Sequence, residues 1–145
     1  MLETHCLRIT IMTILLTYLG LIPFLAGAFI VHSAVNVGLS VQPILMAYSG
    51  MIMAFLSGAQ WGTALRGDLS QHWFVQSNCV ALLAFAGLAI GSPICWLLFL
   101  LCLWYCFVLD VFLQRQGLVT DQYLICRFVV TVVVSVIFVG QWYVS

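Results

Sequence analysis

Two ionisable residues, Asp110 and Arg127, lie inside otherwise apolar stretches of this 145-residue sequence. An unpaired charge inside a lipid bilayer costs a few kcal/mol, and pairing or snorkelling towards water reduces that cost. Each residue lies about one helical turn from the same end of its stretch, so we expect the two to lie level and to form an ion pair. Such a pair is either a structural link between two helices or a charge that holds a ligand or forms a gate.

Other polar residues occur at the same depth in neighbouring apolar stretches. One helix carries a polar stripe of residues that recur every four positions, Tyr123, Arg127, Thr131 and Ser135, and we expect it to face protein or a cavity, not lipid. The complete candidate cluster, for binding or for structure, consists of Gln60, Trp61, Gln76, Asp110, Tyr123, Arg127 and Thr131. Hydrogen bonds between helices account for it without any ligand, and a polar cleft open towards the cytoplasm is the alternative.

Four small residues, Gly50, Ala54, Gly58 and Gly62, also recur every four residues along one helix face. Small side chains allow helix backbones to approach closely in a membrane, where no strong hydrophobic force drives association. The stripe therefore predicts helix packing, either within the bundle or between copies of the chain.

Catalytic and metal-binding patterns are not recognised in the sequence. It holds no arrangement of nucleophile, base and acid, and no closed zinc-ligand set or HExxH motif. His5, His32 and His72 fall in different segments, which disfavours a haem held between two histidines. We therefore expect no catalytic residue, metal or cofactor, and an enzyme acting on a lipid or isoprenoid remains the less favoured class.

The elements that position these residues are five long apolar segments. The chain is 65% hydrophobic and only 6% charged, whereas a soluble domain is about 25% charged. A helix of about 20 apolar residues spans a bilayer, and five segments qualify: Ile9–Val31, Val41–Leu65, Trp73–Ile90, Pro93–Leu113 and Tyr123–Val144. The sequence predicts an all-α integral membrane protein, residues 1–145 forming one bundle of five transmembrane helices, with the first helix bent at Pro23.

The arginines predict the orientation of this bundle in the membrane. With five spans, Arg8, Arg66 and Arg115 fall on one side, Arg127 lies near that side, and the opposite side carries no arginine or lysine. The positive-inside rule then places the N-terminus in the cytoplasm, or in the mitochondrial matrix, and the C-terminus outside. The net charge of zero gives no basis for binding nucleic acid.

Several segments resemble those of a known family. They are "GLIPFLAG", "YSGMIMAFLSGAQWG", the late Asp110 and "YLICRFVVT", and together they are similar to small membrane proteins related to mitochondrial transmembrane protein 69. The positions that match the family pattern are Tyr48, Phe55, Leu56, Gly58, Trp61, Gly62, Tyr123, Arg127 and Thr131, whereas Ser57 replaces a glycine of that pattern. This is a family with a domain of unknown function and many members in bacterial inner membranes, so the resemblance implies a topology and no reaction.

Two functional hypotheses follow from the sequence. The first, which the sequence favours, is a non-enzymatic helix-packing, assembly or accessory subunit that lies in the lipid bilayer and contacts other membrane subunits or further copies of itself. The second is a small carrier or binder of a lipid, a quinone or another hydrophobic molecule, which would use the polar cluster. The absence of an Arg- and Ser-rich leader favours the cell inner membrane, with the mitochondrial inner membrane as the alternative.

Overall fold

The structure is a computed structural model and describes residues 12, 14–33, 40–91 and 93–145. All regular elements in these residues are α-helices, and five of the helices are long and apolar enough to cross a membrane. The first candidate span is Ile14–His32. The helices after its internal break are α2 (Ile22–His32), α3 (Val41–Arg66), α4 (His72–Ile90), α5 (Ile94–Arg115) and α6 (Asp121–Val144).

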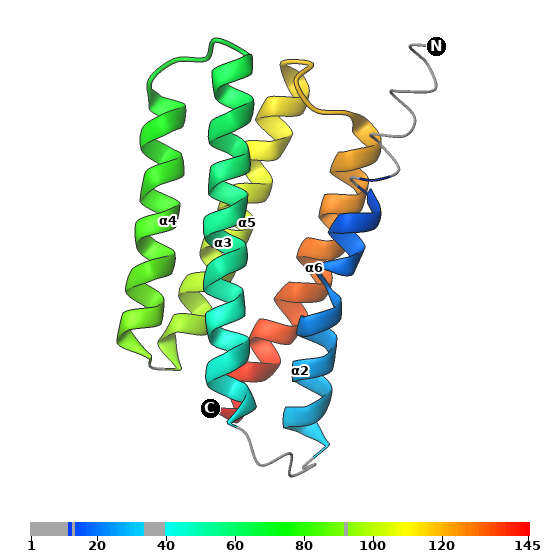
Figure 1. Cartoon of the computed structure of the whole chain (residues 1–145), viewed down its shortest axis with the longest axis vertical. Helices are drawn as coiled ribbons and strands as arrows, with labels where there is room; N and C mark the ends of the chain where they lie inside the picture. Colours follow the sequence, from blue (N-terminus) through cyan, green and yellow to red (C-terminus); the bar gives the residue numbers. More distant parts are fainter. Residues whose placement is uncertain (1–11, 13, 34–39, 92) are drawn as a thin grey trace.

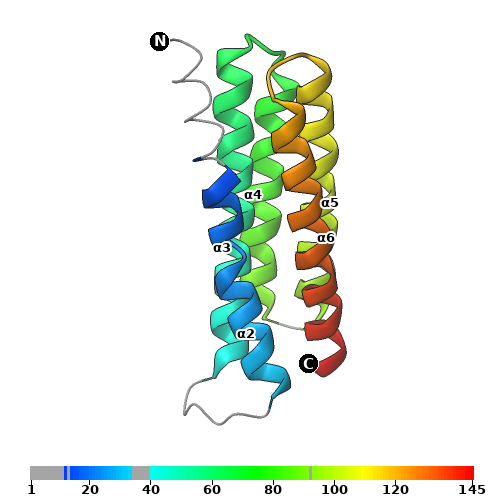
Figure 2. The same cartoon turned by 90° about the vertical axis from the view of Figure 1, so that its right-hand side faces the viewer.

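Successive helices run in alternating directions along one long axis (Figures 1 and 2). The main helix–helix contacts join α3 to α4, α4 to α5 and α5 to α6, and α2 packs against both α3 and α6. The bundle is therefore closed by α2, which lies beside the first and the last of the other four helices. The last four predicted spans agree with the observed helices to within two residues at each end. The predicted start of the first span, together with His5, Cys6 and Arg8, lies outside the described residues.

The tight connection between α4 and α5 is explained by its residues. Gly91 ends α4 in the left-handed conformation, with φ of +61°, which glycine adopts without steric cost. Pro93 then precedes the first residue of α5. The two helices are antiparallel neighbours, as this short connection predicts.

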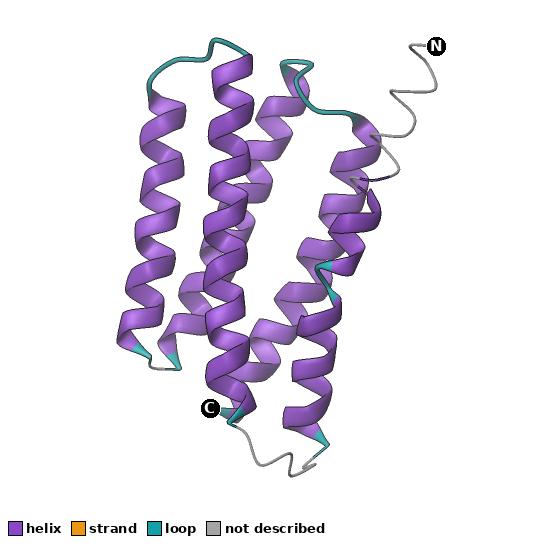
Figure 3. Cartoon of the chain, in the orientation of Figure 1, coloured by secondary structure: helices purple, strands orange, loops and turns teal. Residues whose placement is uncertain are grey.

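The first span is interrupted in its middle. Gly20 and Leu21 form a turn between the helical residues 14–19 and α2, and Figure 3 shows this turn as a loop inside the first span. Pro23 lies in the first turn of α2 and has no N–H group to continue the hydrogen bonding of the preceding helix. The Tyr48 hydroxyl donates a hydrogen bond to the Gly20 carbonyl oxygen at 2.9 Å. The first span is therefore bent as predicted from Pro23, and the break lies at Gly20 and Leu21, just before this proline.

An aromatic cluster fills the core between α2, α5 and α6. The Phe138 ring lies 5.8 Å from Phe24, 5.6 Å from Trp96 and 6.1 Å from Phe99, measured between ring centroids. All four side chains are at most 2% exposed. Aromatic pairs at these separations contribute favourable packing beyond their buried area. The cluster packs α5 against α6, the two helices that carry Asp110 and Arg127.

Candidate functional site

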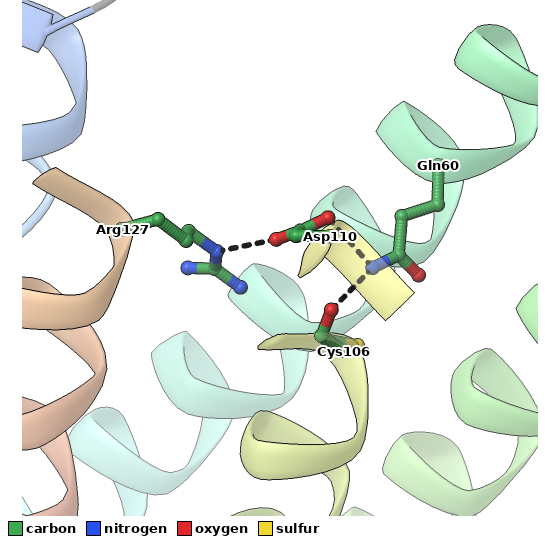
Figure 4. Close-up of polar contacts among 4 residues, drawn as sticks. All are labelled: Gln60, Cys106, Asp110 and Arg127. Carbon is green, nitrogen blue, oxygen red and sulfur yellow. Dashed lines mark hydrogen bonds and ion pairs between the residues drawn. The ribbon is translucent and has the colours of Figure 1, made fainter. Parts of the chain in front are cut away.

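The predicted ion pair forms between α5 and α6. Arg127 Nε lies 3.0 Å from Asp110 Oδ2, and the two side chains are 4% and 6% exposed. The short loop between α5 and α6 places both residues near the same end of the bundle. Figure 4 shows the two side chains extending towards each other from their helices. The charges are therefore neutralised locally, in a region where isolated charges are costly.

Gln60 connects this pair to a third helix, α3. Its Nε2 atom donates hydrogen bonds to Asp110 Oδ1 at 3.0 Å and to the Cys106 carbonyl oxygen at 2.8 Å. Asp110 is thus bound through both carboxylate oxygens, one by an amide and the other by a guanidinium group. Hydrogen bonds to a charged acceptor are stronger than those between neutral groups. We name Gln60, Asp110 and Arg127 the polar triad.

Parts of the polar triad lack a partner in the described part of the chain. Arg127 Nη2 and Gln60 Oε1 are buried with no hydrogen-bond partner, and so is the hydroxyl of Thr131. Arg127 is 3% exposed and Thr131 is 0% exposed. Buried polar atoms are nearly always hydrogen-bonded in proteins, because leaving them unpaired costs free energy. Within the described ranges, the triad therefore holds one unpaired donor, Arg127 Nη2, and one unpaired acceptor, Gln60 Oε1, and the hydroxyl of Thr131 on the same helix as Arg127 is also unpaired.

Two cavities are lined by residues of the triad. The first, which we name the polar cleft, has a volume of about 660 Å³, and its polar lining residues are Gln60, Thr63, Arg66, Asp110, Thr120 and Tyr123. The second, which we name the apolar cavity, has a volume of about 590 Å³. Its walls come from the first span, α3, α5 and α6, and they include Leu16, Phe24, Phe55, Leu103, Val130 and Arg127. Leu56, Ala59 and Tyr123 line both cavities.

The two residues of the ion pair line different cavities. Asp110 and Gln60 line the polar cleft, and Arg127 lines the apolar cavity. The apolar cavity also reaches the outer surface of the bundle, since its wall residues Leu16 and Phe55 are 65% and 69% exposed. The arrangement suits an elongated molecule with one polar and one apolar part.

The remaining predicted cluster residues lie elsewhere. Trp61 is exposed on the outside of α3, with its ring 5.4 Å from that of Phe74 on α4. Gln76 is half-buried on α4, and its Oε1 atom has no hydrogen-bond partner among the described residues. Neither residue lines the two cavities described above. The structure therefore brings together Gln60, Asp110, Tyr123 and Arg127, and places Trp61 and Gln76 apart from them.

The stripe of small residues is only partly inside the bundle. Gly50 is buried, and a Cβ atom added there would lie 2.6 Å from Leu88 Cδ1 of α4. Ala54, Gly58 and Gly62 are exposed, and a Cβ atom at either glycine would meet nothing within 4 Å. Gly50 thus permits close packing of α3 on α4, Ala54 and Gly58 face outwards, and Gly62 lies at the wall of the polar cleft. Packing between copies stays a prediction for them.

Several residues of the site were not singled out from the sequence. The apolar cavity as a whole, including the wall residue Gly20, was not predicted, although Gly20 and Pro23 together signal a broken helix. Arg66 lines the polar cleft, whereas the sequence used it only to predict orientation. Among the described residues, no group of three or more His, Cys, Asp or Glu residues is arranged to hold a metal ion.

Comparison with known proteins gives a family and no activity. A family model described as a protein of unknown function (DUF3429) matches residues 9–143. No curated protein and no solved structure matches the chain. The match covers nearly the whole sequence, including the polar triad and all of the five candidate spans except the last residue of the fifth. The chain therefore belongs to the DUF3429 family of proteins of unknown function.

Proposed function

We propose that this protein is an integral membrane protein that binds an amphipathic membrane molecule, such as a lipid or a quinone, beside the polar triad. The observation that carries the proposal is the position of the Asp110–Arg127 pair between a polar cleft and an apolar cavity. The tail of the ligand would occupy the apolar cavity, and its polar part would reach the triad. Ligand pockets typically have volumes of about 300–1,000 Å³, and both cavities lie in this range.

The proposed membrane setting follows from the helices and the arginines. Arg66, Arg115 and Arg127 lie at or near one end of the bundle, the end opposite Ser145. The positive-inside rule supports an orientation with this end in the cytoplasm or matrix and the C-terminus outside. We propose that this membrane is the inner membrane of a bacterial cell, with the mitochondrial inner membrane as the alternative.

In this setting the ligand would enter sideways from the lipid. The exposed side chains of Leu16 and Phe55 lie where the apolar cavity meets the surface of the bundle. In a bilayer that surface faces acyl chains, so an apolar tail could pass from lipid into the cavity without crossing water. The polar cleft lies nearer the cytoplasmic end, where polar groups of lipids reside.

Filling both cavities from one position tests the proposal. Ala59 lines the polar cleft and the apolar cavity, so the ring in Ala59→Phe would occupy ligand volume. We expect the wild-type protein, extracted gently from its own membrane, to carry a small-molecule adduct in native mass spectrometry. We expect Ala59→Phe to lose at least nine-tenths of this adduct.

The matched control for this experiment is Ala47→Phe. Ala47 is exposed on the same helix and lines neither cavity, so the same ring is added where it faces outwards. The control variant should keep the adduct. A wild-type protein that carries no adduct, or an adduct that persists in Ala59→Phe, would contradict the proposal.

A second candidate function is an assembly or accessory subunit that acts through helix contacts. The exposure of Ala54, Gly58 and Gly62 supports it, because exposed small residues allow another helix to approach α3 closely. Further copies of this chain or other membrane subunits would be the partners. Ala54 and Gly58 line neither cavity, whereas Gly62 also lines the polar cleft, so the two surfaces meet at Gly62.

The variant Gly58→Leu tests this second function. A Cβ atom at Gly58 meets nothing within 4 Å, so the larger side chain leaves the single chain intact and blocks only an external helix. We expect size-exclusion chromatography with light scattering to show a shift from a complex to a single chain. An unchanged complex in Gly58→Leu would remove the stripe as a contact surface.

A further inference from the structure

We infer that the ligand presents an uncharged carbonyl oxygen, and not an anionic group, to Arg127 in the apolar cavity. This inference rests on the proposed binding function and names the chemistry that the site recognises. Two kinds of membrane molecule share this chemistry: the ring carbonyl of a quinone and the ester carbonyl of a glycerolipid.

The first step is the availability of a hydrogen-bond donor. Arg127 uses its Nε atom for Asp110, whereas its Nη2 atom is buried without a partner in the described part of the chain. Of the two charged members of the triad, only Arg127 lines the apolar cavity. A residue that lines an apolar wall and holds an unpaired donor favours a ligand that carries an acceptor among apolar atoms.

The second step is the charge of that acceptor. Among the described residues, Arg127 is the only charged one that lines the apolar cavity, and its charge is already balanced by Asp110 at 3.0 Å. An anionic ligand would bring a second negative charge to one guanidinium group, with the surplus charge buried among Leu, Val and Phe side chains. Burial of such an unbalanced charge is strongly unfavourable. A carbonyl accepts the same hydrogen bond and adds no charge.

The third step is the contrast with the polar cleft. Arg66 lines that cleft, is exposed, and has no carboxylate within ion-pair distance among the described residues. Exposed arginines at the membrane surface attract anionic groups from either water or lipid. The two cavities thus offer different arginines: an exposed and unbalanced one in the polar cleft, and a buried and balanced one in the apolar cavity. The inference concerns the buried arginine alone.

Three probes with the same C16 chain separate these possibilities: hexadecyl acetate, hexadecyl phosphate and hexadecane. The full chain would be purified in dodecyl maltoside, which carries no carbonyl and no charge, and dissociation constants would be measured by native mass spectrometry titration. We expect hexadecyl acetate to bind at least tenfold more tightly than either of the other two probes. If hexadecyl phosphate or hexadecane binds as tightly as hexadecyl acetate, the inference about the carbonyl is overturned, although the cavity still binds a ligand. Failure of all three probes to bind would overturn the proposed function as well.

Two variants test whether Arg127 is the recognising group. Asp110→Asn removes the balancing charge, so we expect the preference to invert and hexadecyl phosphate to bind more tightly than hexadecyl acetate. Arg127→Lys keeps a positive charge for Asp110 but lacks the second planar nitrogen, so acetate affinity should fall about tenfold, towards that of hexadecane. The Lys variant keeps the test available if Asp110→Asn does not fold. An unchanged order and unchanged affinities in these variants would show that Arg127 does not select the ligand.

Competition identifies the source of the carbonyl. A decyl-substituted benzoquinone and dioctanoylglycerol would each be titrated against bound hexadecyl acetate. Displacement by the quinone assigns the site to quinones, and displacement by the diacylglycerol assigns it to glycerolipids. Displacement by neither would contradict recognition of a membrane carbonyl.

Discussion

Arg127→Leu is expected to lower the free energy of unfolding by about 3–5 kcal/mol, the cost of leaving a buried charge without its partner. The Asp110 carboxylate would keep the amide of Gln60 at 3.0 Å but would have no balancing charge. Both members of the pair are at most 6% exposed, so water cannot replace the guanidinium group. The measurement is SDS-induced unfolding in mixed micelles, followed by tryptophan fluorescence.

A double-mutant cycle separates the pair from a general effect of losing an arginine. The double variant Asp110→Asn with Arg127→Leu removes both charges, and it should recover at least half of the lost stability. Arg115→Leu is the matched control, because Arg115 is exposed at the same end of the bundle and takes part in no ion pair among the described residues. Its effect should stay within about 0.5 kcal/mol. A double variant as unstable as Arg127→Leu alone would show that the pair does not stabilise the bundle.

Phe138→Ala is expected to destabilise the protein by about 3 kcal/mol, the lower end of the range for truncating a buried phenylalanine. The lower end applies because acyl chains and the protein core are similarly apolar, so the loss comes mainly from packing. Phe138 touches three other buried rings, and its removal would leave a void between α2, α5 and α6. The same SDS unfolding experiment measures the change.

Phe85→Ala is the control for this second prediction. Phe85 is 69% exposed on α4, and in a membrane its ring faces acyl chains that fill the space left by truncation. The control should change the free energy of unfolding by less than about 0.5 kcal/mol. Equal effects of the two substitutions would mean that the aromatic cluster contributes no specific packing.

The sequence predicts the helices and the ion pair well because both depend on position along the chain. Long apolar segments separated by short polar or glycine-containing breaks define the five spans, and their alternation fixes which residues share a level. Asp110 and Arg127 lie at one level on consecutive helices, so their pairing follows from topology and from the cost of isolated charges. The same reasoning applies to Gln60, which the structure adds to the pair.

The rotation of each helix about its own axis could not be predicted in the same way. Lipid and the interior of the bundle are both apolar, so hydrophobicity does not distinguish an inward face from an outward one. This is why Gly50 packs on α4 while Gly58 of the same stripe faces outwards, and why Trp61 lies away from the triad. The two cavities depend on how side chains from four elements fit together, and no pattern in a single sequence gives that.

The contact between Tyr48 and the break in the first span has a consequence for the biogenesis of the protein. The Gly20 carbonyl oxygen receives its hydrogen bond from a hydroxyl on α3, a helix that is synthesised later. A backbone carbonyl without a hydrogen-bond partner is costly in hydrocarbon. The first span by itself therefore inserts into the bilayer core at a free-energy cost. For a chain that enters the membrane during translation, the first two spans would complete their insertion together, as a hairpin, and Tyr48→Phe would both delay that step and leave the Gly20 carbonyl oxygen without this donor in the finished bundle.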